Sequence, residues 1–156
     1  MAQFASSGKE TTKKDLFRIA MSYANCYVAN ISLGANFIQA IKAFKEADEH
    51  DGPAIIIAYA PCIEQGIKGG MSNSIKEEKL VVESGYVNLM RYNPRENKLY
   101  MDSREPNFDK YEELLQNEVR YNSLYKKDKD LAKELLELNK EDAKRRYYYY
   151  KDLSER

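Results

Sequence analysis

The sequence predicts an α/β fold: a partial, mainly parallel sheet with flanking helices, followed by a charged helical C-terminal segment. Three observations support this. Segments with helical periodicity alternate with segments rich in strand formers, which is typical of strand–helix–strand crossovers. Residues 54–60 are apolar on both faces, as a covered central strand must be. Near Pro106 the composition changes, and 24 of the 50 residues from 107 to 156 are charged.

Length and charge narrow the classes of protein that fit. The 156 residues have the length of one domain or of a piece of one. Lys and Arg number 25, as do Asp and Glu, so we expect no long-range attraction to nucleic acid or to a membrane surface. No apolar stretch reaches the roughly 18 residues that a membrane span needs. Residues 1–14 lack the apolar core of a secretory signal, and the two cysteines therefore indicate a reducing, cytoplasmic setting.

The first elements follow from caps and periodicity. Residues 12–15 have the capping-box pattern and predict a helix start. The apolar stripe of this helix is Leu16, Ile19, Ala20 and Tyr23. Residues 27–33 form the first strand candidate. Asn36 is a suitable cap for a second helix, whose apolar stripe is Phe37, Ile41 and Phe44.

The next elements surround the apolar strand at residues 54–60, which we expect at the centre of the sheet. A second capping box at residues 74–77 predicts another helix, and Gly85 is suited to end it. Residues 87–92 predict a third strand, and residues 99–101 a short antiparallel return. Three parallel strands make a small sheet, so we expect one edge to lack the neighbour that a whole domain would supply.

Two regions therefore organise the chain: an α/β unit at 1–106 and a helical segment at 107–156. In the second, leucines recur at seven-residue spacing over 124–138, which favours a helix packed on a neighbour over a coiled coil. The run of four tyrosines at 147–150 fits either an aromatic docking face or a frayed helix end.

Cys62 is the first candidate for chemistry. It follows the apolar strand at its carboxyl end, where open α/β sheets place their ligands. Pro61 fixes φ and has no N–H to donate, which helps to direct the loop outward. A thiolate here could bind a metal or act as a nucleophile, and a buried inert thiol is the alternative. Cys26 is 36 residues away at the start of a strand and is expected in the core.

The other candidates have simpler explanations. The glycine-rich loop at 66–70 resembles a phosphate cradle in composition, but it lacks the Walker and dinucleotide-binding spacings. His50 lies at a helix end, where the helix dipole favours a surface cation. Arg91, Arg95 and Arg104 could meet an anion, although ordinary salt bridges explain them as well.

Several blocks together resemble the pyruvate:ferredoxin (flavodoxin) oxidoreductases. One of them includes Ala-Tyr-Ala-Pro-Cys-Ile at residues 58–63. The blocks that carry the resemblance are residues 13–16, 21–23, 27–29, 34–36, 52–63, 65–66, 89–95, 102–106 and 118–121. Each block is weak alone, but they occur in the right order over roughly residues 2–150, which makes the combination specific.

The resemblance implies a part of a large oxidoreductase that decarboxylates a 2-oxo acid, pyruvate, to acetyl-CoA. Family members use thiamine diphosphate and Mg, and pass electrons through 4Fe-4S clusters to ferredoxin or flavodoxin. This chain resembles the end of their thiamine-diphosphate-binding domain and the C-terminal segment that follows. The resemblance makes Cys62 one of four ligands of the cluster nearest the thiamine. It also implies a homodimer for the complete, cytoplasmic enzyme.

Two departures from the family pattern indicate a C-terminal fragment. The Gly-Asp-Gly stretch that holds magnesium and diphosphate is missing, and so are the other three cluster cysteines. One thiolate cannot hold a cluster, so we expect the fragment to be inactive without the upstream remainder of the oxidoreductase. The alternative is a stand-alone, non-catalytic α/β protein-binding module, which would have Cys62 buried.

Overall fold

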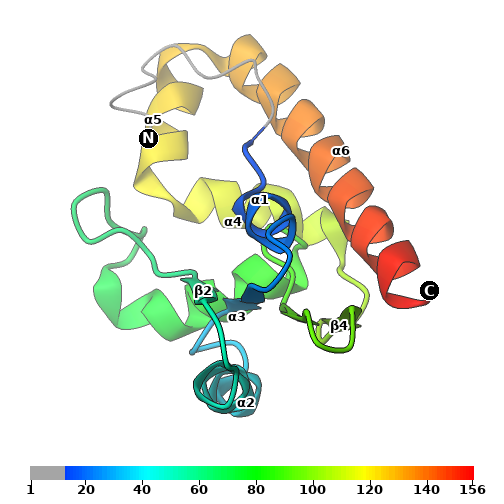
Figure 1. Ribbon diagram of the computed structural model, residues 1–156. Coiled ribbons are helices and arrows are strands. Elements are labelled where there is room, and N and C mark those ends of the chain that lie inside the picture. The colour runs from blue at the N-terminus through cyan, green and yellow to red at the C-terminus, as the bar shows by residue number, and fades with distance from the viewer. Residues whose placement is uncertain (1–12) are drawn as a thin grey trace.

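The computed structural model describes residues 13–156 and shows a four-stranded mixed sheet (Figure 1). The strand order is β2-β1-β3-β4. β1 (Tyr27–Ile31) lies inside the sheet and pairs in parallel with β2 (Ala54–Ala58). On its other side β1 pairs antiparallel with β3 (Met90–Asn93), and β3 pairs antiparallel with β4 (Lys98–Met101). The α/β class and the short antiparallel return are thus confirmed.

The expectation of a mainly parallel sheet is wrong, because two of the three strand pairings are antiparallel. Only the β1–α2–β2 unit is a parallel crossover. The next helix, α3 (Ser74–Glu83), packs against α4 (Tyr111–Asn117) beside the end of β2 and does not run back along a face of the sheet. The chain therefore re-enters the sheet from its carboxyl end, and β3 runs opposite to β1.

Three of the remaining helices contact the sheet, and the fourth packs on other helices (Figure 1). Their bounds are α1 Leu16–Met21, α2 Phe37–Asp48, α5 Val119–Lys127 and α6 Lys129–Ser154, with short 3-10 turns at Met71–Asn73 and Phe108–Lys110. Between residues 13 and 156, no helix combines the length and apolarity needed to cross a bilayer.

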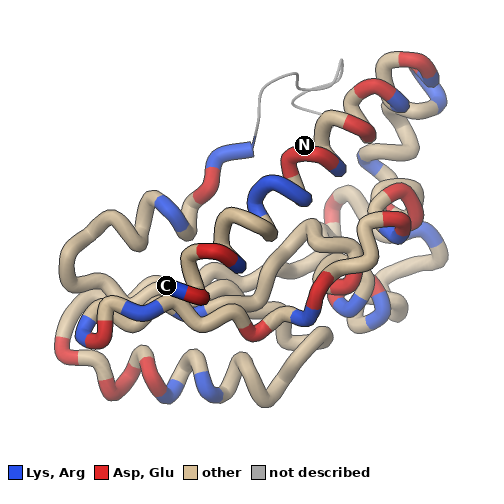
Figure 2. The backbone as a smooth tube through the Cα atoms, turned by 90° about the vertical axis from the view of Figure 1, so that its right-hand side faces the viewer, with Lys and Arg blue, Asp and Glu red and all other residues tan. Residues whose placement is uncertain are grey.

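Helices cover both faces of the sheet (Figure 2). On one face, Phe17 of α1 and Tyr150 of α6 pack with Val28 of β1 and with residues of β3 and β4. On the other face, α2 alone packs against the alternate residues of β1 through Ala40 and Ala43. β1 is buried on both sides because successive side chains of a strand point to opposite faces.

The two predicted apolar stripes do not face the core. Of the stripe on α1, only Ala20 is buried, and the aromatic contact with the core comes from Phe17. On α2, the three large residues of the predicted stripe are exposed, and the buried residues are Gln39, Ala40 and Ala43. Alanines let the helix lie close to the sheet, and the large side chains then point outward.

β2 was expected at the centre of the sheet, but it is an edge strand and is half-exposed. β1 takes the central position instead. Within the described residues, the apolar composition of β2 therefore does not correspond to burial. One edge of this strand has no neighbouring strand, and its side chains are exposed or half-buried.

Local signals placed several helix ends correctly. Asn36 caps α2 by accepting the N–H of Gln39 at 3.0 Å. Gly85, with φ +77°, follows the last turn of α3 as expected. The first helix is capped by Asp15, which accepts the N–H of Arg18, whereas Thr12 of the expected capping box lies outside the described residues.

In the C-terminal region, α6 contacts α5 and β4, so it packs on neighbours, but of the predicted leucines Leu135 is buried and Leu138 is exposed. The tetratyrosine run lies inside α6 and is not a frayed end. Tyr147 and Tyr150 are buried, while Tyr148 and Tyr149 are exposed. The Tyr150 hydroxyl donates to Asp15 at 2.6 Å. The division of the chain at residue 106 stays a prediction.

Candidate functional site

Cys62 lies on the loop that leaves the carboxyl end of β2, as the sequence predicted. Its thiol is free and partly exposed, whereas the alternative of a stand-alone module predicts a buried thiol. The N–H of Gly66 donates to the Cys62 carbonyl at 2.8 Å and closes a turn around the cysteine. Gly66 has φ +74°, a conformation that glycine adopts without strain. The loop thus holds one half-buried cysteine just beyond the carboxyl end of β2.

The far end of this loop is attached to the helical segment. The Lys68 N–H donates to the Asn117 carbonyl at 2.7 Å, and the Val119 N–H lies 3.4 Å from the Gly66 carbonyl. Ile67 and Glu118 form an isolated antiparallel bridge between the same two stretches. The corner between α4 and α5 therefore fixes the cysteine loop, a contact that the sequence did not reveal.

Glu118 is the buried charge at this corner. Its carboxylate accepts a hydrogen bond from the Tyr59 hydroxyl at 2.9 Å and lies 3.3 Å from the Arg120 side chain. Burial, together with the negative charge of Glu118, raises the pKa of Tyr59 well above its ordinary value. Tyr59 consequently stays protonated and acts as a permanent donor that joins the end of β2 to the helical segment.

Glu77 is the second buried carboxyl group near the loop. The sequence assigned it to a capping box, but it points inward and accepts from the Asn117 side chain at 3.1 Å. The N-cap residue of α3 is Asn73, which makes no side-chain capping bond. Burial raises the pKa of Glu77, and the charge of Glu118 raises it further against the lowering effect of the Asn117 bond. Nothing in the sequence distinguished these two glutamates from the many exposed ones.

Three tyrosine rings pack together near the corner between α4 and α5. The ring of Tyr86 contacts the rings of Tyr59 and Tyr111, with centroid distances of 6.2 and 6.0 Å. The Lys13 ammonium lies 4.3 Å above the ring of Tyr86. Burial raises the pKa of Tyr86, but Lys13 and a hydrogen bond from Tyr121 outweigh it, so the net shift is downward.

The other sequence candidates have structural roles. Cys26 is buried in the core, as expected, and burial raises the pKa of its thiol. His50 lies at the end of α2, where its Nε2 is 3.2 Å from the Asn25 carbonyl oxygen. Arg95 and Arg104 are exposed.

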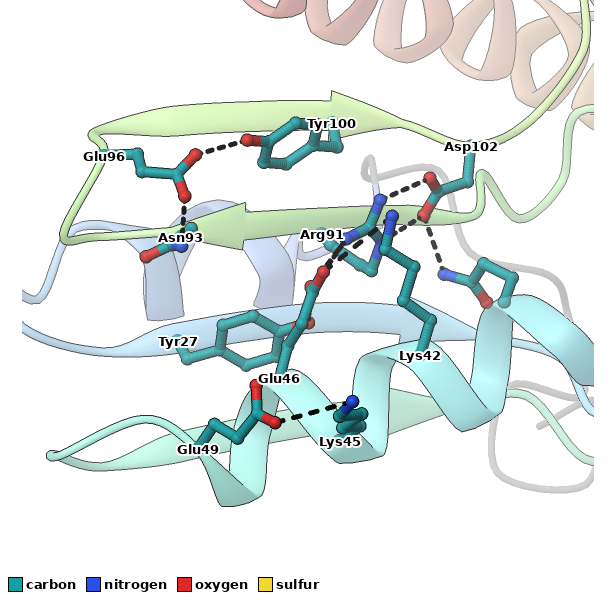
Figure 3. Close-up of polar contacts among 11 residues, drawn as sticks. Tyr27, Lys42, Lys45, Glu46, Glu49, Arg91, Asn93, Glu96, Tyr100 and Asp102 are labelled. Atoms are coloured by element: carbon teal, nitrogen blue, oxygen red, sulfur yellow. Dashed lines mark hydrogen bonds and ion pairs between the residues drawn. The ribbon is translucent and has the colours of Figure 1, made fainter.

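Arg91 is the buried centre of an ion-pair network on the α2 face of the sheet (Figure 3). Its guanidinium contacts Glu46 of α2 at 2.5 Å and Asp102, just after β4, at 2.7 Å. The Tyr27 hydroxyl also donates to Glu46, at 2.8 Å, and Gln39 donates to Asp102 at 3.0 Å. For Arg91, the salt-bridge interpretation is therefore confirmed.

Among the described residues, one free cysteine, Cys62, lies at the loop. Within 13–156, no group of three or more His, Cys, Asp or Glu side chains could hold a metal ion. Cys62 fits a cluster as a single thiolate, and the other ligands of a four-cysteine site would have to come from elsewhere.

Comparison with known proteins gives close relatives along nearly the whole chain, although no family model matches it. The chain is 43% identical over 159 residues to a pyruvate-flavodoxin oxidoreductase of Klebsiella pneumoniae, covering 99% of this chain and 14% of the relative. It is 44% identical over 160 residues to the pyruvate:ferredoxin oxidoreductase of Moorella thermoacetica, with 99% and 13% covered. A mitochondrial pyruvate dehydrogenase [NADP(+)] of Euglena gracilis is 42% identical over 141 residues, with 85% and 8% covered. The chain thus spans about a seventh of the length of the first two.

Proposed function

We propose that this chain, which is homologous to one segment of the pyruvate-flavodoxin and pyruvate:ferredoxin oxidoreductases, works as the C-terminal part of such an enzyme. In this proposal it supplies Cys62 as one thiolate ligand of a 4Fe-4S cluster. The observation that carries the proposal is the position of Cys62: a free, partly exposed thiol beyond the carboxyl end of an open edge strand. A bound cluster would supply electron transfer toward flavodoxin or ferredoxin.

Residues before and after Cys62 fix the backbone of its loop. Pro61 precedes it, and the Gly66 N–H fixes its carbonyl. Asn117 and Glu118 tie the following residues to the helical segment. Fixed backbone at a metal ligand reduces the ordering that binding requires, so we assign to residues 107–156 the task of holding the cysteine loop.

The isolated chain is proposed to be inactive. In the complete enzyme, we assign decarboxylation to thiamine diphosphate and Mg. We propose no residue of this chain as a ligand of either. One thiolate is also too few for a stable cluster. The proposal therefore requires the remainder of the oxidoreductase, with flavodoxin or ferredoxin as electron acceptor and a homodimer as the assembled form.

The test uses the assembled enzyme, made by co-expressing this chain with the remaining part of the oxidoreductase. We expect Cys62→Ser to lower the iron content and to change the electron paramagnetic resonance spectrum of the reduced clusters. Cys26→Ser is the matched control, because Cys26 is buried in the core. If iron content and spectrum are the same in Cys62→Ser and in the unmodified assembly, Cys62 is not a ligand.

A further inference from the structure

Helix α2 presents its large apolar side chains to solvent. The exposed fractions are 63% for Phe37, 80% for Ile38, 53% for Ile41 and 52% for Phe44. Their spacing places them in one stripe, opposite the alanines that face the sheet. Single exposed apolar residues are common, but a continuous stripe of four marks an interaction site.

The adjoining strand β2 has a free edge. Among residues 13–156, only β1 pairs with β2, so the other edge offers backbone N–H and C=O groups to a further strand. Exposed edges usually carry charges, prolines or bulges that prevent pairing. β2 has none of these between Ala54 and Ala58, and its Ile55 is 40% exposed. An unprotected apolar edge of this kind is suited to strand addition.

The two features lie on neighbouring elements, because α2 packs directly on β1 and β2 (Figure 1). We propose that the outer face of α2 and the free edge of β2, here called the α2–β2 surface, bind the remainder of the same oxidoreductase polypeptide. A strand of that remainder would extend the sheet at β2, and an apolar helix would cover the stripe on α2.

The occupant follows from the relatives and from the position of Cys62. Sequence similarity covers 99% of this chain but only 14% of the Klebsiella relative, in which this segment is accompanied by a much longer polypeptide. A second copy of the chain fits less well. A two-fold copy would pair β2 with β2 antiparallel, and the two Cys62 loops would then lie at opposite ends of the joint sheet. Only a different strand could bring other ligands beside Cys62, so this step rests on the proposed function.

The experiment mixes the purified full chain with the remaining part of the Klebsiella oxidoreductase and measures the dissociation constant by calorimetry. We expect Ile38→Glu to weaken binding about tenfold or more, because it places a charge in an apolar contact. The variant should fold, since an acidic residue in the first turn of α2 suits the helix dipole. Leu138→Glu is the control, because Leu138 is also a large exposed apolar residue, at 53%, but lies on α6.

Equal affinities for the unmodified chain and Ile38→Glu would overturn the proposal. So would sedimentation showing that the chain alone forms a dimer that Ile38→Glu dissociates, because a second copy would then be the occupant. Cys62→Ser separates this inference from the proposed function, because Ile38→Glu should weaken binding also when it is introduced into the Cys62→Ser chain, which lacks the proposed ligand. If binding depends on Ile38 but Cys62→Ser leaves the iron content unchanged, the α2–β2 surface stands and the cluster assignment fails.

Discussion

Helices α2 and α6 cover opposite faces of one sheet, and they do so in opposite ways. α6 directs Tyr147 and Tyr150 inward, and the ring of Tyr150 meets that of Phe17 edge-on at 5.6 Å. α2 directs Gln39, Glu46 and alanines inward and leaves its phenylalanines and isoleucines in solvent. Both helices are amphipathic, so amphipathicity alone does not say which side of a helix meets its own sheet.

The difference shows which parts of the fold this chain completes by itself. On the α6 face, aromatic rings and the Tyr150–Asp15 hydrogen bond close the core within residues 13–156. On the α2 face, alanines and the Arg91 network hold the helix, and four large apolar side chains of α2 are left exposed. We therefore expect the stability of the isolated chain to depend on the α6 face and its assembly to depend on α2.

The sharpest contrast compares Tyr150→Ala with Ile38→Ala. Tyr150 is fully buried, so its truncation should lower the free energy of unfolding by about 4 kcal/mol. Ile38 is exposed, and its truncation should change that free energy by no more than about 0.5 kcal/mol. Urea denaturation followed by circular dichroism measures both. Similar losses for the two variants would contradict the difference between the faces.

A second test concerns how α2 is held without large side chains. Replacing Arg91 with Met leaves Glu46 and Asp102 without their shared cation in a largely buried place. We expect a loss of about 3 kcal/mol in the free energy of unfolding, measured in the same way. Arg95→Met is the matched control, because Arg95 is exposed on the turn after β3. A loss at Arg91 no larger than at Arg95 would mean that the network does not hold the helix.

The smallest expected effect is a change in pH dependence at the corner of α3, α4 and the cysteine loop. Burial raises the pKa of Glu77 above its ordinary value of 4.5. Between 4.5 and the raised pKa the folded chain binds more protons than the unfolded chain, so Glu77 makes stability fall as pH rises.

Glu77→Gln removes this titration. The free energy of unfolding of Glu77→Gln should therefore increase, relative to that of the unmodified chain, as pH rises above 4.5. Unfolding curves at a series of pH values measure this difference, and Glu112→Gln, an exposed change on α4, serves as control. A difference between Glu77→Gln and the unmodified chain that does not vary with pH would exclude this account of the buried carboxyl.

Local chemistry explains the predictions that succeeded. Asn36 and Gly85 mark helix ends through interactions with their immediate neighbours, so the sequence is sufficient to place them. Cys62 follows an apolar strand, and its position at the carboxyl end of that strand was predictable for the same reason. The predictions that failed depended on distant partners. Glu77 fits a capping box locally, but Asn117, 40 residues away, provides its hydrogen bond.

The order of residues along the chain was enough to predict the alternation of helices and strands, the helix ends at Asn36 and Gly85, the cysteine at the end of β2 and the relatedness to pyruvate oxidoreductases. These features depend on short spacings or on the order of residues along the chain. Only the tertiary structure decided the direction of β3, the edge position of β2 and the outward face of α2. Covering an apolar residue is favourable whichever surface excludes the water. An apolar pattern therefore predicts that burial is favourable, but it does not identify the surface that provides it.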